Sequence, residues 1–281
     1  KLCRACTQST FFRRVCRARE LRPGKGMKTL AVIPARLGAT RLPRKPLRLL
    51  AGRPLVVRVW ERVSAMGLAD HCVIATDSDE VAQAARANGA EAVLTSPEHV
   101  SGTDRVAEVA RHREFAKFDA IINVQGDEPF ISAAAVSGAL GCVTGDVQIG
   151  TAAVQAIEAI LDEPSIVKVV TADNGRALYF SRAPIPFLRE PKDAGDAAQR
   201  RTRVFQHVGV YAYTKEALNR WVKLATHPLE RIERLEQLRP LAAGMAIGVA
   251  LIPGPLRNGI DTEHDLAKAN SEWTILSGEP A

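Results

Sequence analysis

A cluster of cations in residues 34–46 has the composition of a phosphate-binding loop. The cations are Arg36, Arg41, Arg44 and Lys45, with Gly38 among them. A glycine lets the backbone approach a phosphate, and the cations would neutralise its charge. The segment is neither a Walker sequence nor GxGxxG, which disfavours a P-loop ATPase and a dinucleotide-binding NAD site. A solvated basic loop is the alternative, but the position after a first predicted strand favours an anionic ligand.

Two aspartates far apart in the sequence are candidates for holding a divalent cation. Asp127 follows a buried strand, where Gly126 would allow a sharp turn, and Asp261 precedes a helix. Carboxylates at a strand end beside a phosphate-binding loop supply the hard oxygen ligands that Mg²⁺ takes, with phosphates completing its shell. The alternatives are a turn residue before Pro129 and a helix cap, a common role for aspartate.

Residues 229–241 are predicted to form a helix with a glutamate on its apolar face. At 100° per residue one sector collects Leu229, Ile232, Leu235 and Leu238. Glu236 falls inside this sector and Gln237 on a neighbouring stripe. A carboxylate among leucines is costly unless it is paired. It would either form an ion pair with Arg234 or Arg239 or accept a substrate hydroxyl, and the residues alone favour neither.

The elements that must position these side chains alternate between strand and helix in the first half of the sequence. Apolar runs predict strands at 30–33, 72–75, 91–95 and 120–124. Helices are predicted from 54 to 67, 76 to 89 and 103 to 114. Repeated units of this length imply an α/β fold with a doubly wound, mostly parallel sheet and helices on both faces.

The second half breaks this rhythm. Strands are predicted at 166–171 and 178–181, joined by a hairpin turn at Asp173-Asn174-Gly175. A mobile loop at 189–203, a strand at 208–213, another at 246–252 and a helix at 263–270 follow. We therefore predict a single α/β domain over 27–270 with a smaller mixed-strand lobe at about 165–215, and a tail at 271–281.

The composition excludes several classes of protein. The 281 residues are 46% hydrophobic and 25% charged, unlike disordered, collagen-like or disulfide-dense chains. No apolar run approaches the ~18 residues of a membrane helix, so no membrane insertion is expected. The net charge of +7 lies wholly in residues 1–26, and the remainder carries 30 basic and 30 acidic side chains. A balanced body has no overall field for a polyanion, which disfavours nucleic-acid binding.

Residues 1–26 form a basic leader with eight cations and one acid. Cys3 and Cys6 have CxxC spacing, but zinc needs four ligands and only Cys16 is near. A targeting peptide or an unstructured tail would explain the composition, and we expect a disordered or non-native extension ahead of a natural start at Met27. The other cysteines, Cys72 and Cys142, lie in apolar contexts, which fits a reducing compartment.

Eight segments together resemble the bacterial 3-deoxy-manno-octulosonate (KDO) cytidylyltransferases, or CMP-KDO synthetases, over about Met27 to Asn270. In chain order they are IPARLGATRLPRKPL, VIATDSDEV, SGTDRVAEV, NVQGDEPFI, KVVTADNGRALYFSRAPIP, HVGVYAYT, PLERIERLEQLR and GIDTEHDL. The ordered set is far more specific than any single segment. Enzymes that activate sialic acid share the general logic, but SRAPIP and LEQLR are similar to the octulosonate branch.

The resemblance implies a nucleotide-diphospho-sugar transferase-like core and an activity. CTP and KDO would give CMP-KDO and pyrophosphate, with Mg²⁺ as cofactor, in the cytoplasm. The product would feed lipopolysaccharide synthesis. A homodimer is implied, without nucleic acid as a partner. No side chain stands out as a general base.

The resemblance also implies roles for individual residues. Binding of the triphosphate and catalysis would fall to Arg36, Arg41 and Lys45. The cytidine pocket would be formed by Asp77, Ser101, Gly102, Arg105 and Gln125. The magnesium ligands would be Asp127 and Asp261, which also count as catalytic. The sugar acid would contact Arg182, His207, Tyr211, Glu236 and Gln237, so the resemblance selects the functional alternative for Glu236.

Two positions depart from the family pattern. Arg44 stands where the family usually has glycine, and it would stiffen the loop or add a phosphate contact. Gln206 stands where the family usually has arginine, so a contact to the sugar carboxylate would be missing or supplied by Arg203. The competing functions are a cytidylyltransferase for another acid sugar and a non-catalytic nucleotide-binding module. The latter predicts loss of an aspartate or of the basic loop, and neither is lost.

Overall fold

The computed structural model describes residues 27–38, 41–190, 193–257 and 259–273. The basic leader lies outside the described residues, as does most of the tail. Within the described residues, no helix combines the length and the apolar character needed to cross a membrane.

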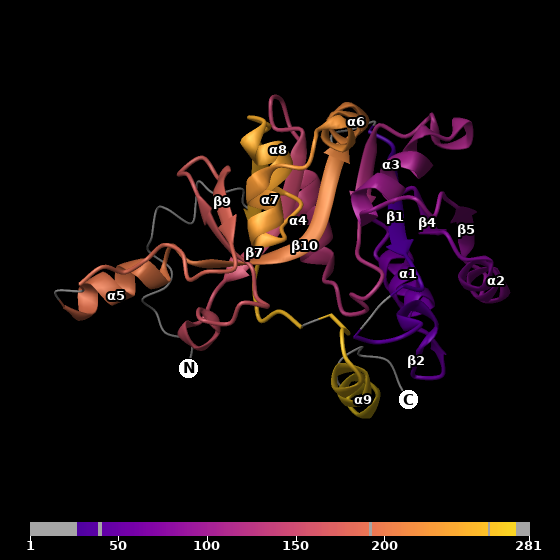
Figure 1. The fold of residues 1–281 in the computed structure, drawn as a ribbon, viewed down its shortest axis with the longest axis horizontal. Coiled ribbons are helices and arrows are strands. Elements are labelled where there is room, and N and C mark those ends of the chain that lie inside the picture. The colour runs from indigo at the N-terminus through magenta and orange to yellow at the C-terminus, as the bar shows by residue number, and fades with distance from the viewer. Residues whose placement is uncertain (1–26, 39–40, 191–192, 258, 274–281) are drawn as a thin grey trace.

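A nine-stranded sheet organises the chain (Figure 1). Its main path runs β11-β7-β10-β6-β1-β4-β5, and β8 pairs with β10 and β9. The strands are β1 (Thr29–Ala35), β4 (His71–Thr76), β5 (Glu91–Leu94), β6 (Ala120–Asn123), β7 (Ile149–Gln155), β8 (Lys168–Thr171), β9 (Ala177–Ser181), β10 (Phe205–Thr214) and β11 (Ile247–Leu251). Along the main path only β10 runs antiparallel to its neighbours. The mostly parallel α/β fold is therefore confirmed.

Helices cover both faces of the sheet. They are α1 (Leu55–Ala65), α2 (Asp79–Ala87), α3 (Gly102–Arg111), α4 (Ala133–Gly141), α5 (Ala194–Arg201), α6 (Lys215–Lys223), α7 (Pro228–Glu233), α8 (Leu238–Ala242) and α9 (Glu263–Ser271). Side chains of β1 alternate between two cores, because successive residues of a strand point to opposite faces. Ala31 and Ile33 pack with α1, α2 and α4, whereas Leu30 and Val32 pack with α3, α6 and α8.

A third, smaller core brings the end of the chain onto the basic loop. Leu42 of the loop and Leu50 of the short β2–β3 hairpin (β2, Leu49–Leu50; β3, Arg53–Pro54) are buried against Ile260 and Leu266. The side chain of Thr262 caps α9 and forms a capping box with Asp265. Burial of these apolar groups holds the segment before α9 beside the loop.

The predicted helix at 229–241 is wrong, because the structure has two short helices, α7 and α8, with a turn between them. Arg234 ends α7 in the left-handed region at φ 53°. The Arg239 side chain reaches back across the turn to both oxygens of Glu230, at 2.8 and 2.5 Å. The helical projection therefore fails beyond Glu233, and Ile232 is 77% exposed rather than part of an apolar face.

The second half of the chain forms the predicted hairpin and one element that the sequence analysis missed. Antiparallel β8 and β9 confirm the hairpin. The segment predicted as a loop at 189–203 contains α5, whose first turn is capped by the Asp193 side chain accepting from Gly195 N and Asp196 N. Because β8 also pairs with β10, the lobe continues the main sheet, and α5 and β9 project to the left in Figure 1.

Helix α4 approaches the sheet so closely that glycine is required beneath it. A Cβ at Gly150 of β7 would lie 1.9 Å from the Ala139 carbonyl oxygen, which is backbone and cannot move aside. We expect Gly150→Ala to lower the free energy of unfolding by about 3 kcal/mol, the cost of overpacking a rigid contact. Urea denaturation would measure it. Gly38→Ala is the control, since a Cβ there meets nothing within 4 Å; equal losses would contradict the close-contact argument.

Candidate active site

The carboxyl ends of β1, β4 and β6 meet at one edge of the sheet and bring three loops together. Ala35 of β1 aligns with Thr76 of β4, and Val32 of β1 aligns with Asn123 of β6. The residues that follow these strands therefore surround one opening, as expected for parallel strands in an α/β sheet. Gly126 lets the loop after β6 lie close to the end of β1, because a Cβ at this position would be 2.8 Å from the Pro34 carbonyl oxygen. Its backbone does not adopt a left-handed turn that only glycine favours.

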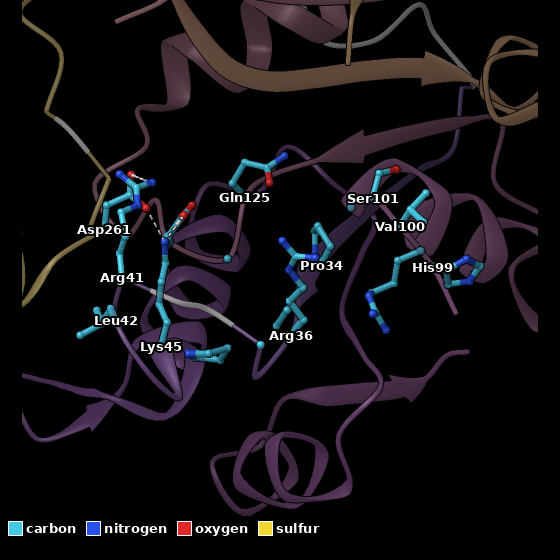
Figure 2. Close-up of a pocket in the computed structure, with 17 residues that line it drawn as sticks. Pro34, Arg36, Arg41, Leu42, Lys45, His99, Val100, Ser101, Gln125 and Asp261 are labelled. Carbon is cyan, nitrogen blue, oxygen red and sulfur yellow. Dashed lines mark hydrogen bonds and ion pairs between the residues drawn. The ribbon is translucent and has the colours of Figure 1, made fainter. Parts of the chain in front are cut away.

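A first cavity of about 420 Å³ occupies this opening (Figure 2). Among the residues that line it are Arg36, Arg41, Lys45, Ser101, Gly102, Arg105, Gln125, Asp127 and Asp261. A second cavity of about 800 Å³ adjoins it, since Arg41, Asp127 and Asp261 line both. The two aspartates therefore lie at the border between two spaces, one of which carries the cationic loop.

Asp127 and Asp261 converge on a single ammonium group. Lys45 Nζ donates to Asp127 Oδ2 at 2.5 Å and to Asp261 Oδ1 at 2.7 Å, drawn as dashed lines in Figure 2. Arg41 adds a contact of 3.0 Å to Asp261 Oδ2. The backbone holds the two segments in place, because Ile260 N donates to the Asp127 carbonyl oxygen at 2.9 Å. Because Asp127 Oδ2 and Asp261 Oδ1 both accept from Nζ, the distance between these two oxygens cannot exceed the sum of their distances to Nζ.

The electrostatics of the site favour a cation between these carboxylates. Burial alone would lower the pKa of Lys45, but the charges and hydrogen bonds of Asp127 and Asp261 outweigh it and raise the pKa. Burial, together with the same two aspartates, raises the pKa of neighbouring Glu128 to about 8. Asp127 and Asp261 thus favour positive charge on their neighbours, as they would favour a metal ion.

The donor set fits Mg²⁺ acting together with a bound triphosphate. No group of three or more His, Cys, Asp or Glu side chains suited to a metal occurs within the described part of the chain. Mg²⁺ commonly takes only one or two carboxylates and completes its shell with water and substrate phosphates. Asp127 and Asp261 provide such a pair, already gathered around a positive charge.

Arg36 is available to a ligand. Its side chain is exposed, lines the first cavity and has no ion-pair or hydrogen-bond partner among the described residues. In the view of Figure 2 it lies between Lys45 on one side and Ser101 on the other. An unpaired guanidinium suits a phosphate, which it can contact through two parallel hydrogen bonds.

The far end of the first cavity is built around a buried arginine. Arg105 of α3 is 2% exposed, and its guanidinium donates to Asp77 Oδ2 at 2.9 Å and to the Thr95 hydroxyl. Asp77 does not line the cavity itself, so in this structure it orients Arg105. Ser101 caps α3 through Asp104 N at 3.1 Å, and Gly102 follows it. The structure thus brings the predicted cytidine residues together. Ser101, Gly102, Arg105 and Gln125 line the cavity, whereas Asp77 contacts only the Arg105 side chain among them.

Glu236 lies in the turn before α8 with one oxygen unsatisfied. Its Oε2 accepts from the Thr103 hydroxyl at 3.1 Å, whereas the buried Oε1 has no hydrogen-bond partner of good geometry among the described residues. Burial raises the pKa of this carboxyl, although the Ser101 hydroxyl is also close enough to lower it in part. The expected structural partner Arg239 is held by Glu230 instead. The ion pair with Arg239 is therefore not formed, and Glu236 lines neither of the two cavities.

His207 lines the second cavity as a neutral ring. Its Nε2 lies 2.9 Å from Thr151 Oγ1, whose own proton has carbonyl acceptors at Val208 and at Val210, the latter at 2.7 Å. His207 is therefore the donor through Nε2, which leaves Nδ1 as an acceptor. Burial lowers the pKa of His207 to about 3, so the ring stays uncharged near neutral pH.

This lowered pKa predicts a pH dependence of stability. Between about pH 6.5 and 3, His207 is protonated in the unfolded chain but stays neutral in the folded protein. The free energy of unfolding therefore falls as the solution is acidified. We expect His207→Gln to flatten that slope in urea titrations at successive pH values. His264→Gln, at an exposed histidine, should keep the wild-type slope, and identical slopes in all three proteins would contradict the burial of a neutral ring.

The other predicted sugar residues lie deeper. Tyr211 and Gln237 are buried and, like Glu236, do not line either cavity. Arg182 is used by the protein itself: its guanidinium donates to the carbonyl oxygens of Glu233, Pro164 and Arg234 at 2.8, 2.8 and 3.5 Å. In this structure Arg182 braces the turn that carries Glu236.

The two departures from the family pattern have distinct structural outcomes. Arg44 has φ 57°, the left-handed region that favours glycine, and its side chain pairs with Glu80 of α2 rather than lining the cavity. It thus ties the loop to a helix. Gln206 lines the second cavity, whereas Arg203 pairs with Asp173 at 3.1 Å and does not line it.

Polar residues at or beside the site that were not singled out from the sequence include Thr103 and Glu128. Thr103 contacts Glu236, and Glu128 lines the second cavity beside Asp127. Thr103 follows the predicted residue Gly102 in the segment SGTDR, and Glu128 follows Asp127 in the segment QGDEP. Proximity to those residues was the available signal.

Comparison with known proteins places the chain in a family. Residues 30–247 match the model of a family described as cytidylyltransferase. A 3-deoxy-manno-octulosonate cytidylyltransferase of Gemmatimonas aurantiaca is 60% identical, covering 89% of this chain and 96% of that protein. One from Burkholderia ambifaria, 3-deoxy-manno-octulosonate cytidylyltransferase 2, is 44% identical over 88% and 93% of the two chains. The solved structure of CMP:2-keto-3-deoxy-manno-octonic acid synthetase complexed with CTP superposes with a TM-score of 0.79 at 37% identity, covering 88% of this chain and 99% of that one.

Proposed function

The chain belongs to the cytidylyltransferase family and, within it, to the 3-deoxy-manno-octulosonate cytidylyltransferases, and from this we propose the reaction it catalyses. CTP and KDO condense to CMP-KDO and pyrophosphate, which activates the sugar for lipopolysaccharide synthesis. The observation that carries the proposal is the convergence of Asp127 and Asp261 with Lys45 at the border of two cavities. One cavity holds the cationic loop and suits a triphosphate, and the other suits the sugar acid.

The first cavity would bind CTP along its length. Arg36, Arg41 and Lys45 would contact the phosphates at the loop end. Ser101, Gly102 and Gln125 would contact cytidine at the α3 end, with Arg105 held in place by Asp77. Cationic groups beside the β- and γ-phosphates stabilise the negative charge that develops on pyrophosphate as it leaves.

Mg²⁺ is part of the proposal, with Asp127 and Asp261 as its ligands. A bound Mg²⁺ neutralises phosphate charge and lowers the pKa of a hydroxyl bound to it. The support is the chemistry of the two converging carboxylates and the positive charge that they already hold. This chain's own part is to keep both carboxylates at the border of the cavities, which Ile260 N and the capping box of α9 accomplish.

The second cavity would bind the sugar acid. His207 offers Nδ1 as an acceptor. Behind the site lie Tyr211 of β10 and the turn that carries Glu236 and Gln237, which Arg182 braces. The anomeric hydroxyl of the sugar attacks the α-phosphate, the bond to pyrophosphate breaks, and the hydroxyl proton passes to solvent water. Direct attack needs no covalent intermediate on the protein, so its residues contribute positioning and charge.

Release of pyrophosphate tests the function. The full chain and a version starting at Met27 would be incubated with CTP and KDO, with Mg²⁺ or with EDTA. We expect release from both proteins only when CTP, KDO and Mg²⁺ are all present. Undiminished release in EDTA would overturn the metal assignment, and absence of release with KDO would overturn the substrate assignment.

A second candidate is a cytidylyltransferase for another acid sugar, such as a sialic acid or an amino-substituted octulosonate. The uncharged Gln206 in the second cavity is the observation that favours it, since the family usually has arginine there. A panel of acid sugars with CTP separates the two, because the preferred substrate has the highest kcat/KM.

We further propose that the protein acts as a homodimer in the cytoplasm. Three apolar side chains are largely exposed on the lobe and on adjoining α7: Leu178 at 61%, Phe187 at 79% and Ile232 at 77%. Large apolar side chains exposed to solvent are candidates for contact sites. Cys72 is not joined in a disulfide, which fits a reducing compartment.

Light scattering tests the dimer. We expect twice the chain mass for the wild type and a shift toward the monomer for Phe187→Glu. Leu49→Glu is the control, at an exposed leucine on β2. A monomeric wild type would contradict the proposal.

A further inference from the structure

The ammonium of Lys45 lies between the two acids, in the place where a divalent cation would have to lie. Nζ is 2.5 Å from Asp127 and 2.7 Å from Asp261, and the Lys45 side chain is only 15% exposed. The two carboxylate groups are more open, at 29% and 45%. The Lys45 ammonium is thus largely enclosed by the protein, while Asp127 and Asp261, with which it pairs, face the cavities.

A lysine and a divalent cation cannot share this position. Opposite charges at such short distances attract strongly, and a second cation placed among the same oxygens would be repelled by the ammonium. A metal ion arriving alone would have to displace Lys45 and leave its charge without a partner. A phosphate bound in the first cavity would offer Lys45 other charged acceptors.

We propose that Lys45 is the resident counter-ion of the Asp127–Asp261 pair and keeps the metal position closed while no nucleotide is bound. The inference rests on the proposed function, because it takes these aspartates as the metal ligands. When a triphosphate enters the first cavity, Lys45 and Arg41 pass from carboxylates to phosphate oxygens, and the two acids become free for the metal. No bond is made or broken in this exchange; one ion pair replaces another.

The exchange couples the two ligands. A nucleotide that draws Lys45 away raises the affinity for the metal, and by linkage the metal raises the affinity for the nucleotide by the same factor. Arg44 is suited to keep the rest of the loop in place meanwhile, since its side chain is tied to Glu80 on α2. The moving parts are then the side chains of Lys45 and Arg41 rather than the loop as a whole.

Titration with Mn²⁺ in the absence of nucleotide tests this directly. Free Mn²⁺ would be followed by its electron paramagnetic resonance signal against wild type, Lys45→Met and Arg44→Met. We expect Lys45→Met to bind Mn²⁺ at least about tenfold more tightly than wild type, because the pair loses its counter-ion. Arg44→Met removes the same charge from the adjacent residue and should match wild type. Equal affinity in all three proteins would overturn the proposal, and so would equal gains in both variants.

Thermal unfolding supplies a second measurement. In EDTA the repulsion between the two carboxylates, then offset only by Arg41 on Asp261, should lower the Tm of Lys45→Met. Mn²⁺ should restore it, since a ligand that binds only the folded state stabilises it. The double variant with Asp261→Asn should lose both the tight Mn²⁺ binding and the restoration. Lys45→Gln replaces Lys45→Met if the latter does not fold. Neither measurement involves CTP, KDO or turnover, so an error in the assigned sugar leaves the result unaffected.

Discussion

Asp127→Asn should lower kcat by roughly a thousandfold, about 4 kcal/mol of transition-state stabilisation, while the protein stays folded. The amide keeps the size of the side chain but removes one of the two charges at the border of the cavities. Lys45 keeps Asp261 as a partner at 2.7 Å, so the free energy of unfolding should change by no more than about 1 kcal/mol. Steady-state pyrophosphate release and urea denaturation measure the two quantities.

The matched control is Asp146→Asn, which removes the same charge from an aspartate that pairs with Arg176 outside both cavities. It should leave kcat unchanged. If Asp127→Asn retained near-normal turnover, the assignment of the metal ligands would be wrong, and with it the mechanism built on the two converging acids. Asp261→Asn should give a loss of similar size, because both carboxylates contact the same ammonium.

The core of the fold could be predicted because its signals are local. Alternating side chains of β1 serve two cores, so a short apolar run already indicates a strand buried on both faces. The reversed direction of β10 is set by how its edges pair with β6 and β7, and its residues carry no such information. Proximity of Asp127 and Asp261 could be inferred from the ordered segments that resemble the family. The structure shows what holds the two segments together, which is a small hydrophobic core around Leu42 and Ile260.

The failures have tertiary causes. The helix predicted at 229–241 breaks because Arg234 takes a left-handed conformation and Arg239 pairs with Glu230 across the turn. Helical periodicity continues through this point, so the pattern alone predicts no break. Similarly, the sequence cannot tell whether an arginine meets a ligand or a carbonyl group. Arg182 resembles a sugar contact by motif, yet its donors contact the backbone oxygens of Pro164 and of the turn at Glu233 and Arg234.

The break at Arg234 also changes the argument about Glu236. On a continuous helix the carboxylate would have been one polar group among leucines. In the turn its Oε2 accepts from the Thr103 hydroxyl, and Oε1 has no hydrogen-bond partner of good geometry among the described residues. Arg239, the expected partner, pairs with Glu230 instead. A buried acceptor without a partner is costly, and the cost is offset when a ligand donates to it.

Glu236→Gln should therefore separate stability from activity. Loss of a charged acceptor for a sugar hydroxyl should reduce kcat/KM for the sugar by about 2 kcal/mol, roughly thirtyfold, with little change in KM for CTP. Stability should move the other way. Because burial raises the pKa of Glu236, the folded protein holds that proton more firmly than the unfolded chain. The resulting stabilisation is full below the unfolded pKa and is lost as the pH rises through the folded one.

At neutral pH and above, glutamine avoids this loss, so the variant should unfold at a urea concentration equal to or higher than that of the wild type. Glu216→Gln, at an exposed position on α6, should match the wild type in both measurements. A variant that lost stability and activity together would show that Glu236 serves the fold. A variant that kept full kcat/KM for the sugar would show that the unsatisfied oxygen meets no substrate. Only reduced sugar turnover with retained or increased stability agrees with a carboxylate that the fold keeps, at a cost, for its ligand.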